Sequence, residues 1–339
     1  MKLKVLLVDV DSTIPNIALM RLSRYYTDHG YDIELRQLHI PLYKHLKSPI
    51  VIDTTGYYRV FVSTIFKGTM EKISFSDLEN VDIGGTGSDD ITKKLPTEIE
   101  NCPPDYSIYP DSDTSYDFFS RGCIRDCEFC LVRKKEGVLH QVSMLSEILA
   151  RSPHKKIKFL DNNFLALSNH LEILQELITL KVRCQFNQGL DIRLVTDANA
   201  SLISKLNYIG EYIFAFDNLN LKLIVEEKLK ILKKYIPKDW KFKFFIYCHP
   251  DMDIVNDVYY RILWCKANRV LPYFMRHQDC WESENRTTYN DFSAWCNQPG
   301  IFKHHTYEEF CKKRRAKKPY PQCCPNWYLE LKNDMETTI

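Results

Sequence analysis

The feature that most constrains the fold of this chain is a repeated alternation of strand-like and helix-like segments, beginning near Tyr116. Runs rich in β-branched and aromatic residues alternate with stretches of helical periodicity, as in parallel strands joined by crossover helices. The predicted strands are 116–120, 156–160, 182–186, 212–216, 242–247 and 269–273. Several of them start about 26 to 30 residues apart, the length of one βα unit. Six such units are two fewer than in a closed eight-stranded barrel.

The first hundred residues form a separate βαβ pattern. A strand at 3–8, a helix at 17–29 and a strand at 33–38 are followed by another apolar strand at 59–65 and the glycine-rich segment 81–87. This predicts a small doubly wound α/β lobe at 1–100, followed by a proline-rich linker at 101–115. The predicted barrel then covers 116–277, and an extension rich in aromatic residues and cysteine covers 278–339.

Composition narrows the class of protein. The chain has 339 residues, of which 45% are hydrophobic, and its formal net charge is +2. No apolar run approaches the ~20 residues that span a bilayer, so we expect a cytoplasmic protein with no membrane partner. The twelve cysteines fit reduced thiols plus a metal site better than a disulfide framework. Only the segment 312–318 is locally basic, which is weak support for nucleic acid as a partner and is explained as well by a solvated surface.

Three cysteines in one short loop carry the strongest chemical signal. Cys123, Cys127 and Cys130 have the spacing C-x3-C-x2-C, with the aromatic residue Phe129 before the last cysteine. Three thiolates can bind three irons of a four-iron cluster and leave the fourth iron open to a ligand. The alternatives are a zinc loop or free thiols, but zinc usually recruits a second short-spaced pair of Cys or His, and no such pair follows here.

This segment resembles the cluster motif of the radical S-adenosylmethionine (SAM) enzymes, whose fold is an open barrel of six βα units. The resemblance implies that Cys123, Cys127 and Cys130 hold a [4Fe-4S] cluster whose open iron chelates SAM. It also implies reductive cleavage of SAM to a 5′-deoxyadenosyl radical that acts on a substrate. Phe129 would lie beside the adenine, and a flavodoxin-type or ferredoxin-type protein would supply the electron.

Polar residues follow the predicted strands at the edge where βα barrels place their chemistry. The second strand ends in Asp161-Asn162-Asn163, which departs from the Gly-Gly-Glu-like turn of many radical SAM proteins but resembles the Asp-x-x-Phe ending of relatives with a cobalamin-type lobe. By this resemblance we expect Asp161 and Asn162 to contact SAM. Arg193 is expected to pair with the SAM carboxylate and Asp217 with the ribose hydroxyls. His249 and the pair Arg276-His277 end later strands.

The lobe at 1–100 resembles the cobalamin-binding domain that precedes the barrel in many radical SAM proteins. It lacks the Asp-x-His-x-x-Gly motif that supplies a cobalt-ligating histidine, and it is short for enclosing a corrin. We therefore expect a degenerate lobe that does not bind cobalamin. The glycines of 84–87 are explained as well by a tight turn that needs positive φ.

Other interpretations stay open at this point. Lys134-Lys135-Glu136-Gly137 is similar to the Lys-Glu-Gly that follows the cysteine loop in tRNA methylthiotransferases, which makes RNA methylthiolation one candidate activity. A non-catalytic iron–sulfur sensor or scaffold and a zinc-dependent nucleic-acid module are the rivals from other classes. Cysteines 280, 296, 311, 323 and 324 are expected to be free thiols, because their spacing fits no compact cluster motif.

Overall fold

The computed structural model describes residues 2–41 and 46–317, and it divides into two compact units, Met1–Asn162 and Asn163–Ile339. The two units are treated separately below. Cys323, Cys324 and Trp327, and the end of the basic segment, lie outside the described residues. Among the described residues, no helix combines the length and the apolar character needed to cross a lipid bilayer.

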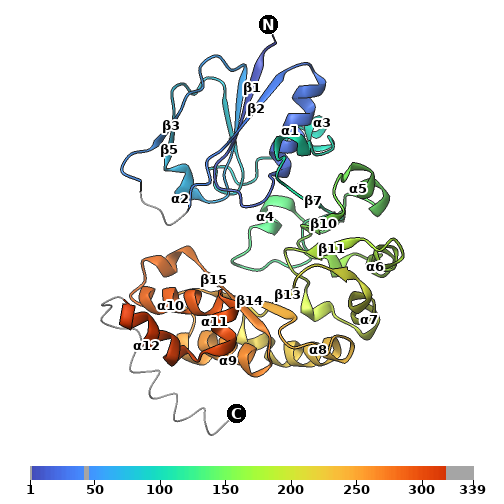
Figure 1. Ribbon diagram of the computed structural model, residues 1–339, viewed down its shortest axis with the longest axis vertical. Helices are drawn as coiled ribbons and strands as arrows, with labels where there is room; N and C mark the ends of the chain where they lie inside the picture. Colours follow the sequence, from blue (N-terminus) through green and yellow to red (C-terminus); the bar gives the residue numbers. More distant parts are fainter. Residues whose placement is uncertain (1, 42–45, 318–339) are drawn as a thin grey trace. The chain divides into compact units, whose positions relative to one another are not determined.

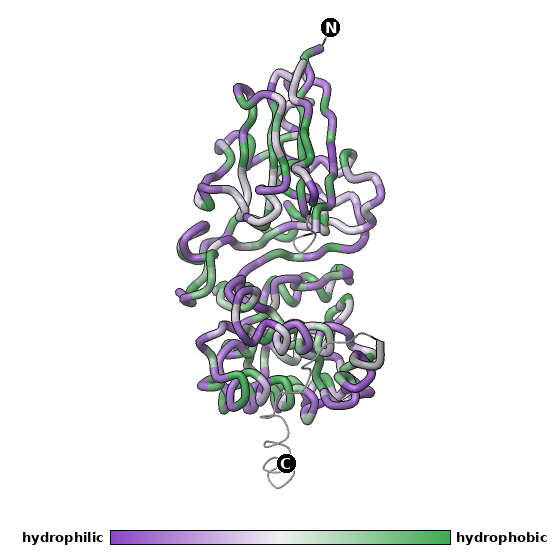
Figure 2. The backbone as a smooth tube through the Cα atoms, turned by 90° about the vertical axis from the view of Figure 1, so that its left-hand side faces the viewer, coloured by the Kyte–Doolittle hydropathy of each residue, from purple (hydrophilic) through white to green (hydrophobic). Residues whose placement is uncertain are grey.

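The first unit begins with a four-stranded parallel sheet. Its strands are β1 (Lys4–Asp9), β2 (Asp32–Gln37), β4 (Arg59–Ser63) and β6 (Val81–Gly84), in the order β2-β1-β4-β6. The central strand β1 is buried from Val5 to Asp9, as expected for a parallel strand covered on both faces. In Figure 2, hydrophobic stretches run along the strands of this lobe near the N label.

The two faces of this sheet are covered differently (Figure 1). Helices α1 (Ile17–Asp28) and α3 (Thr97–Glu100) cover one face, where Leu19 and Ile99 pack with Val5 and Leu7. The other face packs against the short parallel pair β3 (Ile50–Ile52) and β5 (Ile73–Phe75) and the helix α2 (Lys67–Met70). The predicted doubly wound lobe thus has helices on one face and mainly strands on the other.

The rest of the first unit holds the segment around the three cysteines. The parallel strands β7 (Thr114–Asp117) and β10 (Lys156–Phe159) pair with each other, and β8 (Ser120–Arg121) pairs with β9 (His140–Gln141) in antiparallel fashion. The 3-10 turn η1 (Tyr106–Ile108) precedes β7, α4 (Val132–Glu136) follows the cysteines, and α5 (Leu145–Arg151) leads to β10.

The second unit continues the alternation of strands and helices. Its elements in chain order are η2 (Phe164–Ala166), α6 (His170–Thr179), β11 (Arg183–Phe186), η3 (Ile192–Leu194), α7 (Asp197–Lys205), β12 (Asn207–Tyr208), β13 (Tyr212–Ala215), η4 (Leu219–Leu221), α8 (Lys222–Tyr235), β14 (Phe242–Cys248), the π-helical turn η5 (Ile254–Tyr259), α9 (Tyr260–Ala267) and β15 (Leu271–Arg276). Strands β13, β14 and β15 form one parallel sheet, and β11 pairs with β12. Buried aromatic residues such as Phe214, Phe242 and Phe244 fill this region.

The described chain ends in a helical segment. It consists of η6 (Gln278–Trp281), α10 (Arg286–Cys296), α11 (Pro299–His304) and α12 (Tyr307–Lys317). Trp295 and Tyr289 on α10 are fully buried, and the Trp295 indole N–H donates to the carbonyl oxygen of His305 at 3.1 Å. Cys280, Cys296 and Cys311 are buried and form no disulfide. Packing therefore accounts for the aromatic residues of this segment.

The predicted α/β class with parallel strands is confirmed, with two local corrections. The prediction of one strand at 116–120 is wrong, because the backbone N–H groups of Phe118, Phe119 and Ser120 donate to the carboxylates of Asp117 and Asp161 instead of to a neighbouring strand. The strand predicted at 269–273 runs from Leu271 to Arg276, because Arg269 has a positive φ of 51° and belongs to a turn.

Candidate functional site

The three cysteines lie in an irregular loop between β8 and β9. All three residues are partly buried, and none of them forms a disulfide. The backbone N–H of Arg125 donates to the Cys123 Sγ at 3.3 Å, and the N–H of Cys130 donates to the Cys127 carbonyl oxygen at 2.9 Å. These contacts fold the segment between the first and the last cysteine into a compact loop.

Gly122 allows the two ends of the loop to come together. Its φ is +76°, and a Cβ at this position would lie 2.3 Å from the carbonyl oxygen of Val138, closer than real atoms approach. The Cys123 N–H donates to the Gly137 carbonyl oxygen at 3.3 Å, and the Arg133 guanidinium donates to the Cys123 carbonyl oxygen at 2.9 Å. The backbone on either side of the cysteines is thus tied together at its base.

Glu136 fastens the same loop from its carboxyl-terminal side. One carboxylate oxygen accepts from the Gly122 N–H at 2.9 Å and from the Asn162 side-chain amide at 2.8 Å. The other oxygen accepts from the Arg121 guanidinium at 2.9 Å. Glu136 therefore connects the residues just before the first cysteine to the end of β10. The Lys-Glu-Gly similarity to methylthiotransferases has a local structural explanation in these contacts.

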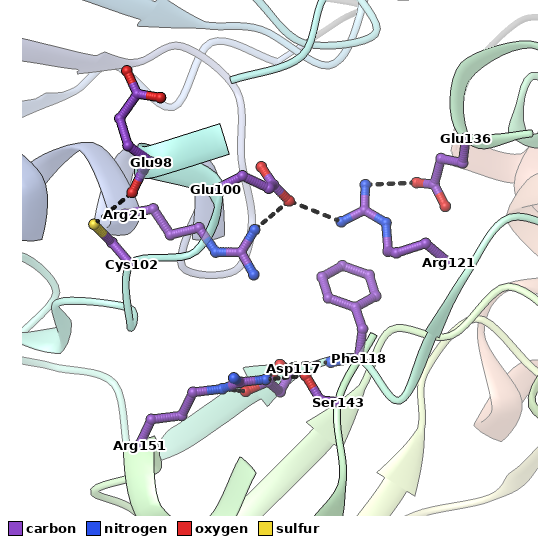
Figure 3. Close-up of polar contacts among 10 residues, drawn as sticks. All are labelled: Arg21, Glu98, Glu100, Cys102, Asp117, Phe118, Arg121, Glu136, Ser143 and Arg151. Carbon is purple, nitrogen blue, oxygen red and sulfur yellow. Dashed lines mark hydrogen bonds and ion pairs between the residues drawn. The ribbon is translucent and has the colours of Figure 1, made fainter. Parts of the chain in front are cut away.

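A row of alternating charges runs from this carboxylate to the lobe (Figure 3). Arg121 also lies 3.9 Å from the Glu100 carboxylate of α3, which in turn pairs with Arg21 of α1. The Arg121 guanidinium stacks on the Phe118 ring, 4.4 Å from its centroid. Of the two ion pairs of Arg121, the one with Glu136 is better shielded, because the side chain of Glu136 is 14% exposed and that of Glu100 is 42% exposed.

Asp161 is buried and engaged with the backbone that precedes the cysteines. Its carboxylate accepts from the Phe119 N–H at 3.2 Å, and from the N–H and hydroxyl of Ser120 at 2.6 Å each. Burial raises the pKa of Asp161 to about 7, and the hydrogen bonds from Ser120 and Phe119 oppose that shift. The structure thus gives Asp161 a role in holding the approach to the cysteine loop.

A second carboxylate fixes the start of this approach (Figure 3). Asp117 at the end of β7 accepts two hydrogen bonds from the Arg151 guanidinium, at 2.6 and 2.8 Å. Arg151 also donates to the Ser143 hydroxyl at 2.5 Å. The side chain of Asp117 is 5% exposed, so this pair is well shielded from water. The backbone before the cysteines is therefore fixed by Asp117 and Asp161 together.

A cavity of about 640 Å³ opens inside the first unit. It is lined on one side by residues at the ends of lobe strands, including Ser63 and Gly84, and on the other by Arg121, Lys135 and Glu136 around the cysteine loop. Its volume is in the range of pockets for drug-sized ligands. The lobe thus presents its strand ends to the residues that flank the cysteines.

Close packing against neighbouring backbone explains why two positions of the segment 84–87 are glycine. A Cβ on Gly85 would lie 2.1 Å from the Thr64 carbonyl oxygen, and one on Gly87 would lie 2.6 Å from the backbone of Phe66. Gly85 also has a positive φ of 102°. The backbone of segment 84–87 therefore packs directly on the backbone that follows β4. This supports the tight-turn explanation of the glycines.

In the second unit, Arg193 and Asp217 belong to one charged group at the strand ends. The Arg193 guanidinium donates to both carboxylate oxygens of Asp191, at 2.6 and 3.0 Å. Burial raises the pKa of Asp217 to about 6, while the charges of Arg261 and Arg193 oppose that shift. We expected the Arg193 guanidinium to pair with the SAM carboxylate, and in the structure it is already hydrogen-bonded to Asp191.

The predicted site residues fall into two sets. Cys123, Cys127, Cys130, Phe129, Asp161 and Asn162 belong to the first unit, and Arg193 and Asp217 belong to the second. Phe129 is 42% exposed. Asn162 reaches the cysteine loop through Glu136. Within each unit, the predicted residues lie close to the other members of their set.

Two charged residues that hold neighbouring groups in place were not predicted from the sequence. Glu100 receives Arg21 and approaches Arg121, and nothing in its local sequence distinguishes it from a surface carboxylate. Arg261 is completely buried and donates to the carbonyl oxygens of Phe216 and Tyr247, at 2.8 and 3.0 Å. An arginine within the apolar stripe of α9 was the available signal for Arg261, because a buried cation needs partners.

The chain has no match among family models, and the search of curated proteins also finds no match.

Proposed function

We propose that this protein is a radical SAM enzyme in which Cys123, Cys127 and Cys130 hold a [4Fe-4S] cluster. The observation that supports this most directly is the cysteine loop itself. Three partly exposed thiols lie in one short loop whose base is fixed by Gly122 and Glu136. When bound, the cluster and SAM would supply a 5′-deoxyadenosyl radical for hydrogen abstraction from a substrate that the residues do not identify.

The donor set fits a cluster with one open iron. Three soft thiolate ligands suit iron–sulfur chemistry, and a set of three leaves one iron for another ligand. Among the described residues outside this loop, Cys184, Cys248, Cys265, Cys280, Cys296 and Cys311 are buried. Burial raises the pKa of the Cys184 thiol to about 12, so this cysteine is a poor source of thiolate. Cys102 is partly exposed like the three loop cysteines, but it stands alone in the sequence, so the loop offers the better set of ligands.

The residues around the loop would act as positioning groups. Asp161 and Asp117 hold the backbone from Phe118 to Ser120, and Glu136 holds Gly122. These contacts fix the backbone just before Cys123, and the thiols take no part in them. In this proposal Asp161 acts on SAM through the loop, while Phe129, which is 42% exposed, would stack on the adenine.

The fold that we propose around this site is a partial barrel of six βα units. Its strands would be β7, β10, β11, β13, β14 and β15, which follow one another in the chain with helices between them. The parallel pairs β7 with β10, β13 with β14, and β14 with β15 support this arrangement. Asp217 and Arg193 follow strands of this set and are the proposed contacts to the ribose and carboxylate of SAM.

The Lys-Glu-Gly similarity does not select an RNA substrate. Glu136 is accounted for by its bonds to Arg121, Gly122 and Asn162, and Gly137 has a positive φ of 80° at the end of α4. These roles serve any radical SAM protein with this loop. Lys312 and Arg314 of the basic segment pair with Glu308 and Asp291, at 2.7 and 3.1 Å, which supports a structural use of those charges.

The test is electron paramagnetic resonance of the anaerobically reconstituted and reduced protein, with and without SAM. We expect the signal of a reduced four-iron cluster, and we expect SAM to change it because SAM binds the open iron. Stoichiometric zinc without iron uptake would contradict the cluster. A cluster signal that saturating SAM leaves unchanged would contradict the enzyme and favour an iron–sulfur scaffold.

A further inference from the structure

Two histidines come together at the ends of adjacent strands in the second unit. Strands β14 and β15 are parallel, and their register pairs Cys248 with Arg276. The next residue on each strand is a histidine, so the register places His249 beside His277. The backbone N–H of His277 donates to the Cys248 carbonyl oxygen at 2.8 Å, and the centroids of the two imidazole rings are 4.7 Å apart.

Asp279 completes a set of three metal-binding groups. One of its carboxylate oxygens lies 3.5 Å from His249 Nε2, and the other lies 3.4 Å from His277 Nδ1. One donor atom from each of the three residues lies within 4.8 Å of the other two. Two donors that each sit about 2.1 Å from one ion in tetrahedral geometry are about 3.4 Å apart. The distances of 3.5 and 3.4 Å match this spacing, but they run to different oxygens of Asp279. The three donor atoms lie within 4.8 Å of one another, so the side chains would draw closer together around an ion.

The surroundings of His249 fit a metal ligand as well. Its other ring nitrogen, Nδ1, lies 3.3 Å from a carboxylate oxygen of Asp251. In a metal-bound state this carboxylate would be placed to accept from the Nδ1–H and so to orient the ring. Asp279 and Asp251 place two carboxylates beside the two imidazole rings, and such a group suits a divalent cation.

The three side chains are also accessible from solvent. The exposed fractions are 27% for His249, 32% for His277 and 53% for Asp279. A set of three protein ligands leaves at least one coordination position for water or another molecule, as in catalytic metal sites. Two nitrogen donors and one carboxylate favour a first-row transition metal over Ca²⁺ or Mg²⁺, which prefer oxygen donors.

We propose that His249, His277 and Asp279 form a second metal site, which binds a divalent first-row transition metal such as Zn²⁺ or Fe²⁺. The proposal does not depend on the cysteine loop or on SAM chemistry. The alternative is that both histidines only make local turn contacts. His277 Nδ1 accepts from the Asp279 N–H at 3.4 Å and so caps η6, and His249 Nδ1 accepts from the Asp251 N–H at 3.2 Å.

The test is a titration of the full chain with Co²⁺ under anaerobic reducing conditions, followed by competition with Zn²⁺. The protein carries Cys123→Ser, Cys127→Ser and Cys130→Ser, so that the loop thiols bind no metal. We expect one Co²⁺ per chain with ligand-field bands and no thiolate charge-transfer band. We expect His249→Ala, and independently Asp279→Asn, to weaken binding at least about 100-fold. Asp251→Ala should weaken it about 10-fold to 100-fold.

His304→Ala is the matched control, because this histidine is exposed in the same unit and outside the cluster. It should bind Co²⁺ as the parent does. Circular dichroism and thermal unfolding show whether each variant keeps its fold. No binding by the folded parent, equal binding by His249→Ala and Asp279→Asn, or a thiolate charge-transfer band that Cys280→Ser removes would each overturn the proposal.

Discussion

The cysteine loop of the first unit and the histidine cluster of the second unit present donor atoms in different ways. In the loop, all donors come from one contiguous segment, 123–130, which closes on itself because Gly122 adopts a positive φ. In the cluster, the two histidines follow the ends of β14 and β15 and are brought together by the register of these strands, while Asp279 lies in η6. A local motif can therefore be recognised in a sequence, whereas a site built by strand register emerges only with the structure.

The largest expected effect is the loss of the cluster on replacement of one loop cysteine. Cys127→Ala leaves two thiolates, so iron bound after anaerobic reconstitution should fall to background. Cys102→Ala is the control, because Cys102 lies outside the loop and donates to the Glu98 carbonyl oxygen at 3.2 Å. It should retain the iron and sulfide content of the parent. Equal iron in both variants would contradict the assignment of the loop.

The role of Gly122 gives the next largest effect and has a matched control within the loop. Gly122 and Gly137 both have positive φ, but a Cβ on Gly137 meets nothing within 4 Å. Gly137→Ala should therefore cost only the backbone strain, about 1 to 3 kcal/mol at its φ of 80° and ψ of −151°. Gly122→Ala should cost about 1 to 3 kcal/mol more, because its Cβ overlaps the Val138 carbonyl.

Denaturant titration of both glycine variants, together with their iron uptake, checks this prediction. If the two alanine variants unfold at the same denaturant concentration and load iron equally, Gly122 does not close the loop.

The contrast between the cysteine loop and the histidine cluster also explains which parts of the site could be predicted from the sequence. The cysteine spacing and Phe129 are contiguous, so the loop could be predicted without knowledge of any long-range contact. The use of Asp161 could not, because it depends on where the backbone of Phe119 and Ser120 lies relative to β10. Arg193 was predicted to pair with the SAM carboxylate, but the Asp191 carboxylate in the same turn accepts from its guanidinium.

The fold shows the same division between local and long-range information. Strand β10, predicted at 156–160, runs from Lys156 to Phe159, and β13, predicted at 212–216, runs from Tyr212 to Ala215, because burial patterns within one strand are local. Strand β7 ends early because side-chain carboxylates take the N–H groups of residues 118–120. Capture of backbone donors by distant side chains leaves no periodic signal in the sequence.

The pH dependence of stability tests the structural role of Asp161. Burial raises the pKa of Asp161 to about 7, against about 3.9 in an unfolded chain. Between these values the folded state binds the proton more tightly, so the contribution of Asp161 to the free energy of unfolding falls as the pH rises from about 4 to about 7.

Asp161→Asn should remove that contribution, by at most about 1.4 kcal/mol per pH unit. Denaturant titrations of the parent and the variant at matched pH values measure it. Asp111→Asn, at an exposed position in the same unit, should follow the parent. Parallel stability curves for the parent and Asp161→Asn would contradict the burial of a titrating carboxylate at this position.

A smaller effect is expected for the proposed SAM contact at Arg193. Because Asp191 already accepts two hydrogen bonds from Arg193, its replacement by Ala should weaken SAM binding only about tenfold, or ~1.4 kcal/mol. Isothermal titration calorimetry on the reconstituted protein measures this. Arg183→Ala, an exposed arginine at the start of β11, is the control. Unchanged SAM affinity with full iron content in Arg193→Ala would remove Arg193 from the site.

The last prediction concerns cobalamin, which we expect the lobe not to bind. A cavity of about 640 Å³ suits a small ligand, and the glycines of 84–87 pack against backbone. We therefore predict no stoichiometric binding of hydroxocobalamin in equilibrium dialysis. Micromolar stoichiometric binding, on the order of 8 kcal/mol, would show that the lobe serves a corrin.

The most direct test of the central proposal is the production of 5′-deoxyadenosine by the anaerobically reconstituted protein, supplied with SAM and a strong reductant. Chromatography of the quenched reaction should show 5′-deoxyadenosine and methionine in equal amounts, formed only when the reductant is present. Cys127→Ala should form neither product, and Cys102→Ala should match the parent. A protein that carries a full complement of four-iron cluster, binds SAM and yet forms no 5′-deoxyadenosine would contradict the account.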